Sequence, residues 1–417
     1  MRERFRRFWA IVLSVLIIFQ IPAGDGSSIG DELRKAVAAE MPAYTINLGT
    51  GVLQTEDGYQ WSADQGDTVY YGQGAAVANS GGMSYRVLKN DGKAMLLDCA
   101  QTYKYENHLN NYSAFGTWEG STPQEDMNSE TENKLLLESE ELSKVLNTTH
   151  PEESYTAKDG SVYTSPAGTD KVFMLSAQEA ETYYADAADR AKGGAYWLRS
   201  NYNDKELTDA NVYVTQSGQI EKTTSGTYAA SPAFRINSSK SGVLFTSTLT
   251  GKNDELKQPE QVSDNHEWAL TVLTNGTIDV SDEEVTVNAE EISGDNTEPA
   301  GAGVSVAWTA GAMVNDFDLT YESAEYSILI TDKSYTASDA KIKWYGRIST
   351  VAAGDVSPVS FQLPTDYKTT DHVYILAEKD FKNNKGETYL SHATRPQEID
   401  LGISQVTVDS ENTHLVT

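Results

Sequence analysis

Cysteine is almost absent from this 417-residue chain, which contains only Cys99. A single cysteine excludes an intramolecular disulfide, so packing must supply the stability of the fold. The shortage is unusual for an animal secreted domain and suits an exported bacterial protein. Cys99 ends the apolar run Met95–Cys99, a buried-strand context in which a thiol is normally inert rather than nucleophilic.

Positive charge is also scarce, with 32 Lys and Arg residues against 61 Asp and Glu residues and a net charge of -29. Such a chain repels polyanions, which excludes nucleic acid as a partner. Divalent cations or a basic surface would be attracted, and the charge also favours solubility outside the cell.

No apolar run is long enough to cross a bilayer comfortably as a helix, which takes about 20 residues. The longest, from Phe8 to Ile21, follows four arginines and precedes Pro22-Ala23-Gly24. This layout is typical of a secretory signal peptide, with the cut expected near Ala23. The predicted location is extracellular or on the cell surface. An uncleaved leader remains the alternative, and it would be the protein's only contact with a membrane.

Enzyme signatures are missing too. The sequence has no Gly-x-Ser-x-Gly elbow, His-Glu-x-x-His helix, phosphate-cradling loop or dinucleotide fingerprint. Paired carboxylates could still serve a glycan-processing hydrolase, although the sequence does not indicate which pair would face a cleft. No residue of the sequence is therefore predicted to be catalytic.

The composition changes along the chain and predicts five segments. After the signal peptide (1–23) comes a polar segment (24–65), and then an α+β domain (66–249). A polar linker (250–265) precedes a region of short alternating strands (266–417), which predicts an all-β Ig-like sandwich.

Local signals mark several elements of the α+β domain. Asn90-Asp91-Gly92 predicts a hairpin turn between strands 84–89 and 94–100. Ser129 with Glu132, and Ser176 with Glu179, form capping-box patterns that predict the starts of two helices. Four further strands are expected around 171–175, 196–200, 210–215 and 233–236.

The order of four strand motifs carries a resemblance. They are Tyr85-Arg86-Val87-Leu88, Lys171-Val172-Phe173-Met174-Leu175-Ser176, Tyr196-Trp197-Leu198-Arg199-Ser200 and Ser231-Pro232-Ala233-Phe234-Arg235. The set, spanning 70–245, resembles an uncharacterised secreted family of Gram-positive gut bacteria with a WRVL, KVFLLS, YWLRS and RPAF order. The resemblance implies a C-type-lectin-like fold. Tyr85 replaces the family's usual Trp, and Ser231 replaces an arginine, so an anion-binding role is not expected there.

Candidate ligand-binding residues gather in a polar, aromatic stretch. Trp118 lies between Gly116 and Gly120, where an aromatic ring can stack on a sugar. His108, Asn111 and Tyr112 precede it and are expected to share the surface. Arg199, within an apolar strand, either pairs with a buried carboxylate or presents its guanidinium to a ligand. Core packing of the rings and a structural pairing of the arginine remain the alternatives.

The candidate calcium site consists of Asn201, Asn203 and Asp204, which offer the oxygen ligands that calcium prefers. These residues are too few to complete a coordination sphere, so a solvated turn is the competing interpretation, and no other cofactor is expected.

The combined prediction is an exported bacterial surface protein that binds an extracellular glycan or protein without catalysis, through a lectin-like domain held by an Ig-like spacer. A glycan-processing hydrolase and a structural envelope protein remain alternatives.

Overall fold

The computed structural model describes a set of residues that lies within the second of two compact units, Met1–Ala43 and Tyr44–Thr417. The described residues are 44–46, 53–55, 67–72, 83–91, 93–102, 111–129, 137, 139–203, 209–238, 242–248, 256, 267–278, 283–287, 303–308, 325–337, 340–352, 359–383 and 385–401. The predicted signal peptide (1–23) lies outside them. Among the described residues, no helix has the length and apolarity that crossing a membrane requires.

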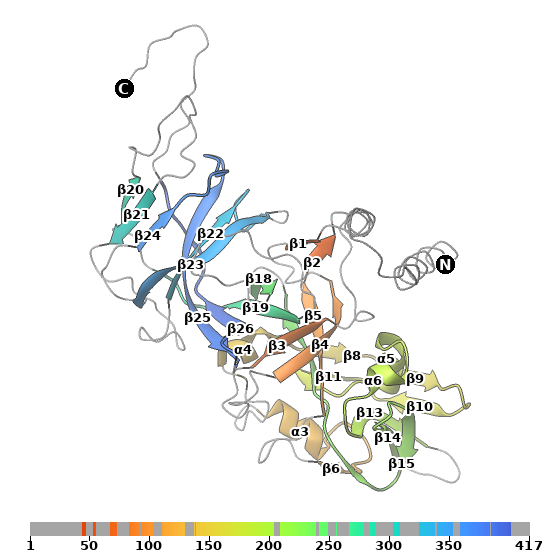
Figure 1. Cartoon of the computed structure of the whole chain (residues 1–417). Helices are drawn as coiled ribbons and strands as arrows, with labels where there is room; N and C mark the ends of the chain where they lie inside the picture. Colours follow the sequence, from red (N-terminus) through yellow and green to blue (C-terminus); the bar gives the residue numbers. More distant parts are fainter. Residues whose placement is uncertain are drawn as a thin grey trace, which may run out of the picture. The chain divides into compact units, whose positions relative to one another are not determined.

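One long mixed sheet runs through the described structure (Figure 1). Its strands, in spatial order, are β12 (Val172–Phe173), β17 (Ala233–Asn237), β5 (Ala94–Cys99), β4 (Met83–Asn90), β3 (Thr68–Tyr71), β19 (Glu267–Leu273), β26 (Thr388–Ala393), β25 (His372–Lys382), β22 (Glu325–Thr331) and β23 (Ile342–Ala352). Short strands extend it: β7 (Val145–Leu146) beside β17, β18 (Val243–Thr248) beside β19, and β27 (Gln397–Glu398) beside β25.

A second sheet of five strands holds most of the candidate site. Its order is β15 (Ile220–Thr223), β14 (Ala210–Val214), β13 (Tyr196–Tyr202), β10 (Val162–Ser165) and β9 (Glu153–Thr156), and every neighbouring pair is antiparallel.

Smaller sheets complete the strand set. They pair β1 (Tyr44–Ile46) with β2 (Leu53–Thr55), β8 (Thr148–His150) with β11 (Gly168–Asp170), and β6 (Tyr112–Ser113) with β16 (Thr227–Tyr228), and they join β20 (Glu283–Val287), β21 (Gly303–Trp308) and β24 (Val359–Gln362).

The described helices are short: α3 (Thr122–Asn128), α4 (Ser139–Lys144), α5 (Ala177–Tyr183) and α6 (Ala187–Arg190). The predicted capping box at α5 is confirmed, because Ser176 and Glu179 satisfy each other's backbone N–H groups. Ser129 caps the end of α3, and residues 130–136, which would form the helix predicted to start there, lie outside the described residues; the next described helix begins at Ser139.

The hairpin between β4 and β5 confirms the turn predicted at Asp91. Its carboxylate accepts hydrogen bonds from the N–H groups of Lys93 and Ala94, at 3.0 and 2.8 Å, which closes the turn. Those bonds also lower the pKa of Asp91.

The predicted fold class, an α+β C-type-lectin-like domain followed by an all-β Ig-like sandwich, is wrong. The structure is mostly β-sheet, with large mixed sheets. Strands from both sides of the polar segment 250–265 share the long sheet, since β3 pairs in parallel with β19 and β19 with β26. Sequence periodicity showed which segments are extended but not which strands become neighbours.

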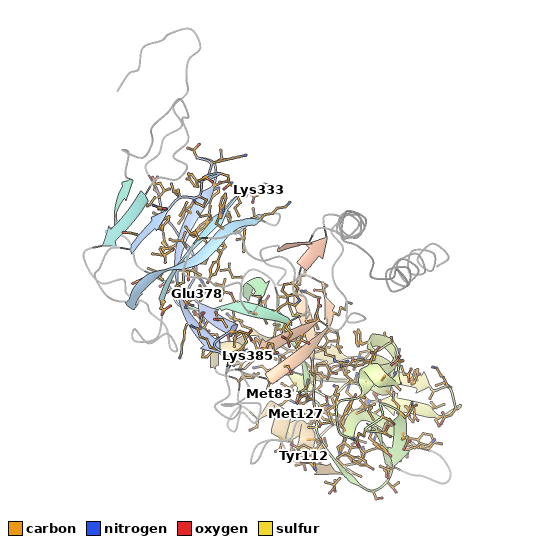
Figure 2. All side chains as sticks on the ribbon, in the orientation of Figure 1. Met83, Tyr112, Met127, Lys333, Glu378 and Lys385 are labelled. Carbon is orange, nitrogen blue, oxygen red and sulfur yellow. The ribbon has the colours of Figure 1, made fainter. Side chains whose placement is uncertain are left out.

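Buried polar contacts accompany that pairing. The imidazole Nε2 of His392, on β26, lies 3.2 Å from a carboxylate oxygen of Glu141, on α4, and both side chains are fully buried. The phenol of Tyr71 donates to the Glu141 carbonyl at 2.7 Å. Farther along the sheet lies Glu378, which is labelled in Figure 2. It accepts hydrogen bonds from Ser327 and Tyr345. These partners reduce the cost of burying polar groups between strands.

Candidate functional site

Trp118 belongs to the core in this structure. Its side chain is 2% exposed, and its indole N–H donates to Asp170 Oδ2 at 3.0 Å. The ring also meets Phe115 edge-on, with centroids 6.4 Å apart. Gly116 and Gly120, both at positive φ, shape the loop around it. The indole therefore presents no open face for a sugar to stack on.

Tyr112 is likewise buried, whereas Asn111 beside it is exposed. The Tyr112 hydroxyl donates to Asp126 on α3 at 2.9 Å, and burial raises its pKa well above the ordinary value. Strand β6 positions Tyr112 by pairing with β16, and Asn111 directly precedes that strand. Of the predicted surface, Asn111 faces solvent, and His108 lies outside the described residues.

Two asparagines hold the loop that carries Trp118. The Asn211 side chain, fully buried, accepts hydrogen bonds from the N–H groups of Phe115 and Gly116, at 2.8 and 3.0 Å, and donates to the Gly116 carbonyl at 2.6 Å. Asn201 donates to the same carbonyl. Side chains of the five-stranded sheet therefore hold the backbone of this loop by hydrogen bonds, in addition to side-chain packing.

Two residues of the predicted calcium site form hydrogen bonds with backbone groups. Asn201 is buried and directs its amide nitrogen at the Gly116 carbonyl, and Asn203 accepts a hydrogen bond from the Asp209 N–H at 2.7 Å. Asp204 lies outside the described residues. Within the described part of the chain, no group of three His, Cys, Asp or Glu residues is placed to hold a metal ion.

Arg199 is 1% exposed and contacts two carboxylates. Its Nη2 lies 3.4 Å from Glu153 on β9 and 3.1 Å from Glu179 on α5. Its Nε and Nη1 atoms have no hydrogen-bond partner among the described residues. The guanidinium thus joins a strand to a helix, as in the structural pairing that the sequence left open.

His150 lies in the same region and is neutral at physiological pH. Burial and the nearby Arg199 and Arg235 guanidinium groups lower its pKa to about 3. Its ring packs edge-on against Phe173, with centroids 4.2 Å apart. The positive charge of this region therefore comes from the arginines, and Glu153 and Glu179 offset it at Arg199.

A stacked, partly exposed tyrosine pair joins β14 of the five-stranded sheet to β16. Tyr213 on β14 and Tyr228 on β16 are both partly exposed, with ring centroids 4.4 Å apart and planes at 18°. Behind them lies Trp197, fully buried, whose indole donates to the Tyr112 carbonyl at 2.7 Å and whose ring is 4.7 Å from that of Tyr228. The core thus fixes the pair rigidly in place.

A carboxylate lies beside the tyrosine pair. The Tyr213 hydroxyl donates to the exposed carboxylate of Glu221 at 2.8 Å, and burial, then this bond, raise the Tyr213 pKa. Strand pairing places Tyr228 opposite Tyr112 and exposed Thr227 opposite exposed Ser113, so alternation directs the second pair to the other side of these strands. We call Tyr213, Tyr228 and Glu221 the tyrosine face.

Sequence reasoning missed Tyr213 and Tyr228. It assigned a strand to 210–215, and the alternation there placed Tyr213 opposite the inward Val212 and Val214. The pairing of Tyr228 with Tyr112 joins residues far apart in the sequence. No local pattern could have shown that the two rings stack.

Burial makes the thiol of Cys99 unreactive. The thiol is 2% exposed, and burial raises its pKa to about 11, so it stays protonated at pH 8. We expect iodoacetamide at pH 8 to leave Cys99 unmodified in the native protein and to alkylate it completely in denaturant, as measured by intact mass. Rapid alkylation of the native protein would contradict this placement.

Comparison with known proteins gives one match. Residues 91–238 match a family described as a domain of unknown function, DUF6273. The matched region begins at the β4–β5 turn and ends after β17, so it contains Arg199, Trp118 and the whole tyrosine face. No curated protein matches the chain, and no solved structure does.

Proposed function

We propose that this chain is an exported bacterial surface protein that binds a glycan without catalysis, through the tyrosine face. The observation that carries the proposal is the stacked pair of Tyr213 and Tyr228, partly exposed and backed by buried Trp197. Aromatic rings held rigidly beside hydrogen-bonding groups suit a sugar, whose C–H faces pack on rings and whose hydroxyls need donors and acceptors.

The charge of the chain narrows the ligand class. Its net charge of -29, with the Glu221 carboxylate next to the rings, disfavours anionic polysaccharides. We therefore propose a neutral glycan. The leader at 1–23 and the resemblance to an uncharacterised secreted family of Gram-positive gut bacteria support the exported location, and both are part of the proposal.

Replacing Tyr228 with alanine tests this function. We expect at least a tenfold weaker affinity, about 1.4 kcal/mol, because the sugar would lose the ring on which it stacks. The measurement is a neutral-glycan array followed by calorimetry on the glycans that bind. Tyr155→Ala is the matched control, since Tyr155 is also a partly exposed strand tyrosine but lies on β9.

Three outcomes of this experiment show whether a neutral glycan binds and whether it binds at the tyrosine face. Loss of binding in Tyr228→Ala with retention in Tyr155→Ala supports the tyrosine face. Equal affinity in both variants and the wild type would place the ligand elsewhere, and no binding on the array would contradict a neutral-glycan function.

A hydrolase remains the second candidate because Glu153 and Glu179 both approach one nitrogen of Arg199. Their carboxyl groups are thus near neighbours, as carboxylate catalysis requires. Glu179 also accepts the Ser176 N–H at 2.8 Å, which gives it a helix-capping role. Turnover of a polysaccharide by the wild type, lost in Glu153→Gln, would favour this candidate over simple binding.

A further inference from the structure

A buried cluster outside the tyrosine face brings a lysine amine and a carboxylate into contact. Lys192, just after α6, meets Asp98 Oδ2 on β5, and neither side chain is exposed. The rings of Tyr196 and Tyr184 lie 4.6 and 5.8 Å from the amine. An ion pair here loses its hydration, and a neutral link between the two groups would avoid that cost.

Two hydroxyl groups complete the cluster. Ser231 Oγ lies 2.7 Å from Lys192 Nζ and donates to Asp98 Oδ1 at 3.2 Å. The Tyr184 hydroxyl donates to Asp98 Oδ2, the other carboxylate oxygen. One hydroxyl therefore bridges the amine and one oxygen, while the second hydroxyl polarises the other oxygen.

We propose that Lys192 and Asp98 condense into an intramolecular amide bond. A bond forms between Nζ of Lys192 and Cγ of Asp98, and the bond from Cγ to Oδ1 breaks. Two protons of the ammonium pass through Ser231 to Oδ1, which leaves as water. Oδ2 becomes the amide oxygen and keeps the hydrogen bond from Tyr184. The reaction needs no oxidant, reductant or other reactant.

The surroundings favour this reaction in three ways. Burial lowers the pKa of Lys192, which favours the neutral amine that attacks. Fixed contact between the two groups replaces a bimolecular encounter. A dry site, with Cys99 2% and Tyr184 3% exposed, also disfavours the reverse hydrolysis.

The bond would give this chain a covalent link that its cysteine content cannot provide. Asp98 and Lys192 are 94 positions apart, so the amide would close a long loop and restrict the unfolded chain, as a disulfide does. It would tie β5 of the long sheet to the segment that precedes β13.

Mass spectrometry of the purified full chain, digested in denaturant, tests the bond. We expect a branched peptide that joins the fragments of Asp98 and Lys192, lighter than their sum by one water molecule. Lys343 and Asp371 are an internal control, because they are also in contact, but the Lys343 side chain is 21% exposed. We expect that pair to remain unlinked.

Three variants test which side chains the amide bond requires. Lys192→Arg keeps the charge but should abolish the branched peptide, and Ser231→Ala should leave the bond incomplete because the proton relay is lost. Lys222→Arg, a change at a lysine outside the cluster, should leave the branched peptide intact. Unlinked Asp98 and Lys192 peptides at full yield from the folded wild type would overturn the proposal, whether or not the variants fold.

Discussion

Alanine at Gly218 should destabilise the protein by about 3 kcal/mol or more, because a side chain there collides with backbone. A Cβ atom at Gly218 would lie 1.6 Å from the carbonyl oxygen of Ala187, and the residue has a φ of +83°. The Gly218 carbonyl also accepts a hydrogen bond from Arg190 at 3.0 Å, so the turn cannot move away without losing that contact.

Gly160→Ala measures the cost of the left-handed backbone conformation without a steric collision. Gly160 has nearly the same φ, +84°, but a Cβ there would meet nothing within 4 Å. We expect a loss of about 1–2 kcal/mol from the left-handed conformation alone. Urea unfolding of both variants measures the difference, and equal losses would show that the α6 contact of Gly218 is absent in solution.

Trp197→Ala should cost about 3–5 kcal/mol, the usual range for removing a large buried aromatic side chain. Trp197 is fully buried, contacts Phe115, Tyr213 and Tyr228, and donates to the Tyr112 carbonyl. Its removal leaves a cavity behind the tyrosine face and takes away the indole donor of the Tyr112 carbonyl. Thermal or urea unfolding measures the loss.

Trp197→Phe is the matched variant, because it keeps an aromatic ring and loses the N–H. We expect a smaller loss than for alanine, with at least about 1 kcal/mol from the Tyr112 carbonyl left without its donor. If Trp197→Ala were as stable as the wild type, the indole would not form the support on which the tyrosine face depends.

Local chemistry made several elements predictable. Ser176 and Glu179 are three residues apart, so a capping box could be read directly, and Asp91-Gly92 signalled its hairpin in the same way. The apolar run at Tyr196–Ser200 became the buried strand β13. Each signal lies within a few residues of the element that it predicts.

Long-range pairing was not predictable from such signals. The register that sets Trp268 beside Val69, and so joins both halves of the chain in one sheet, depends on residues far apart in sequence. A Gly-flanked tryptophan suggested an exposed ring, but Asp170 supplied a buried acceptor for the Trp118 indole.

The claim that a glycan contacts the tyrosine face can be tested most directly by NMR. The full chain would carry isotope-labelled tyrosine, with ring resonances assigned by substitution, and would be titrated with a neutral glycan that binds it. We expect the ring resonances of Tyr213 and Tyr228 to shift, and those of Tyr155 on β9 and Tyr163 on β10 to stay unchanged. Saturable binding that leaves Tyr213 and Tyr228 unchanged would contradict it.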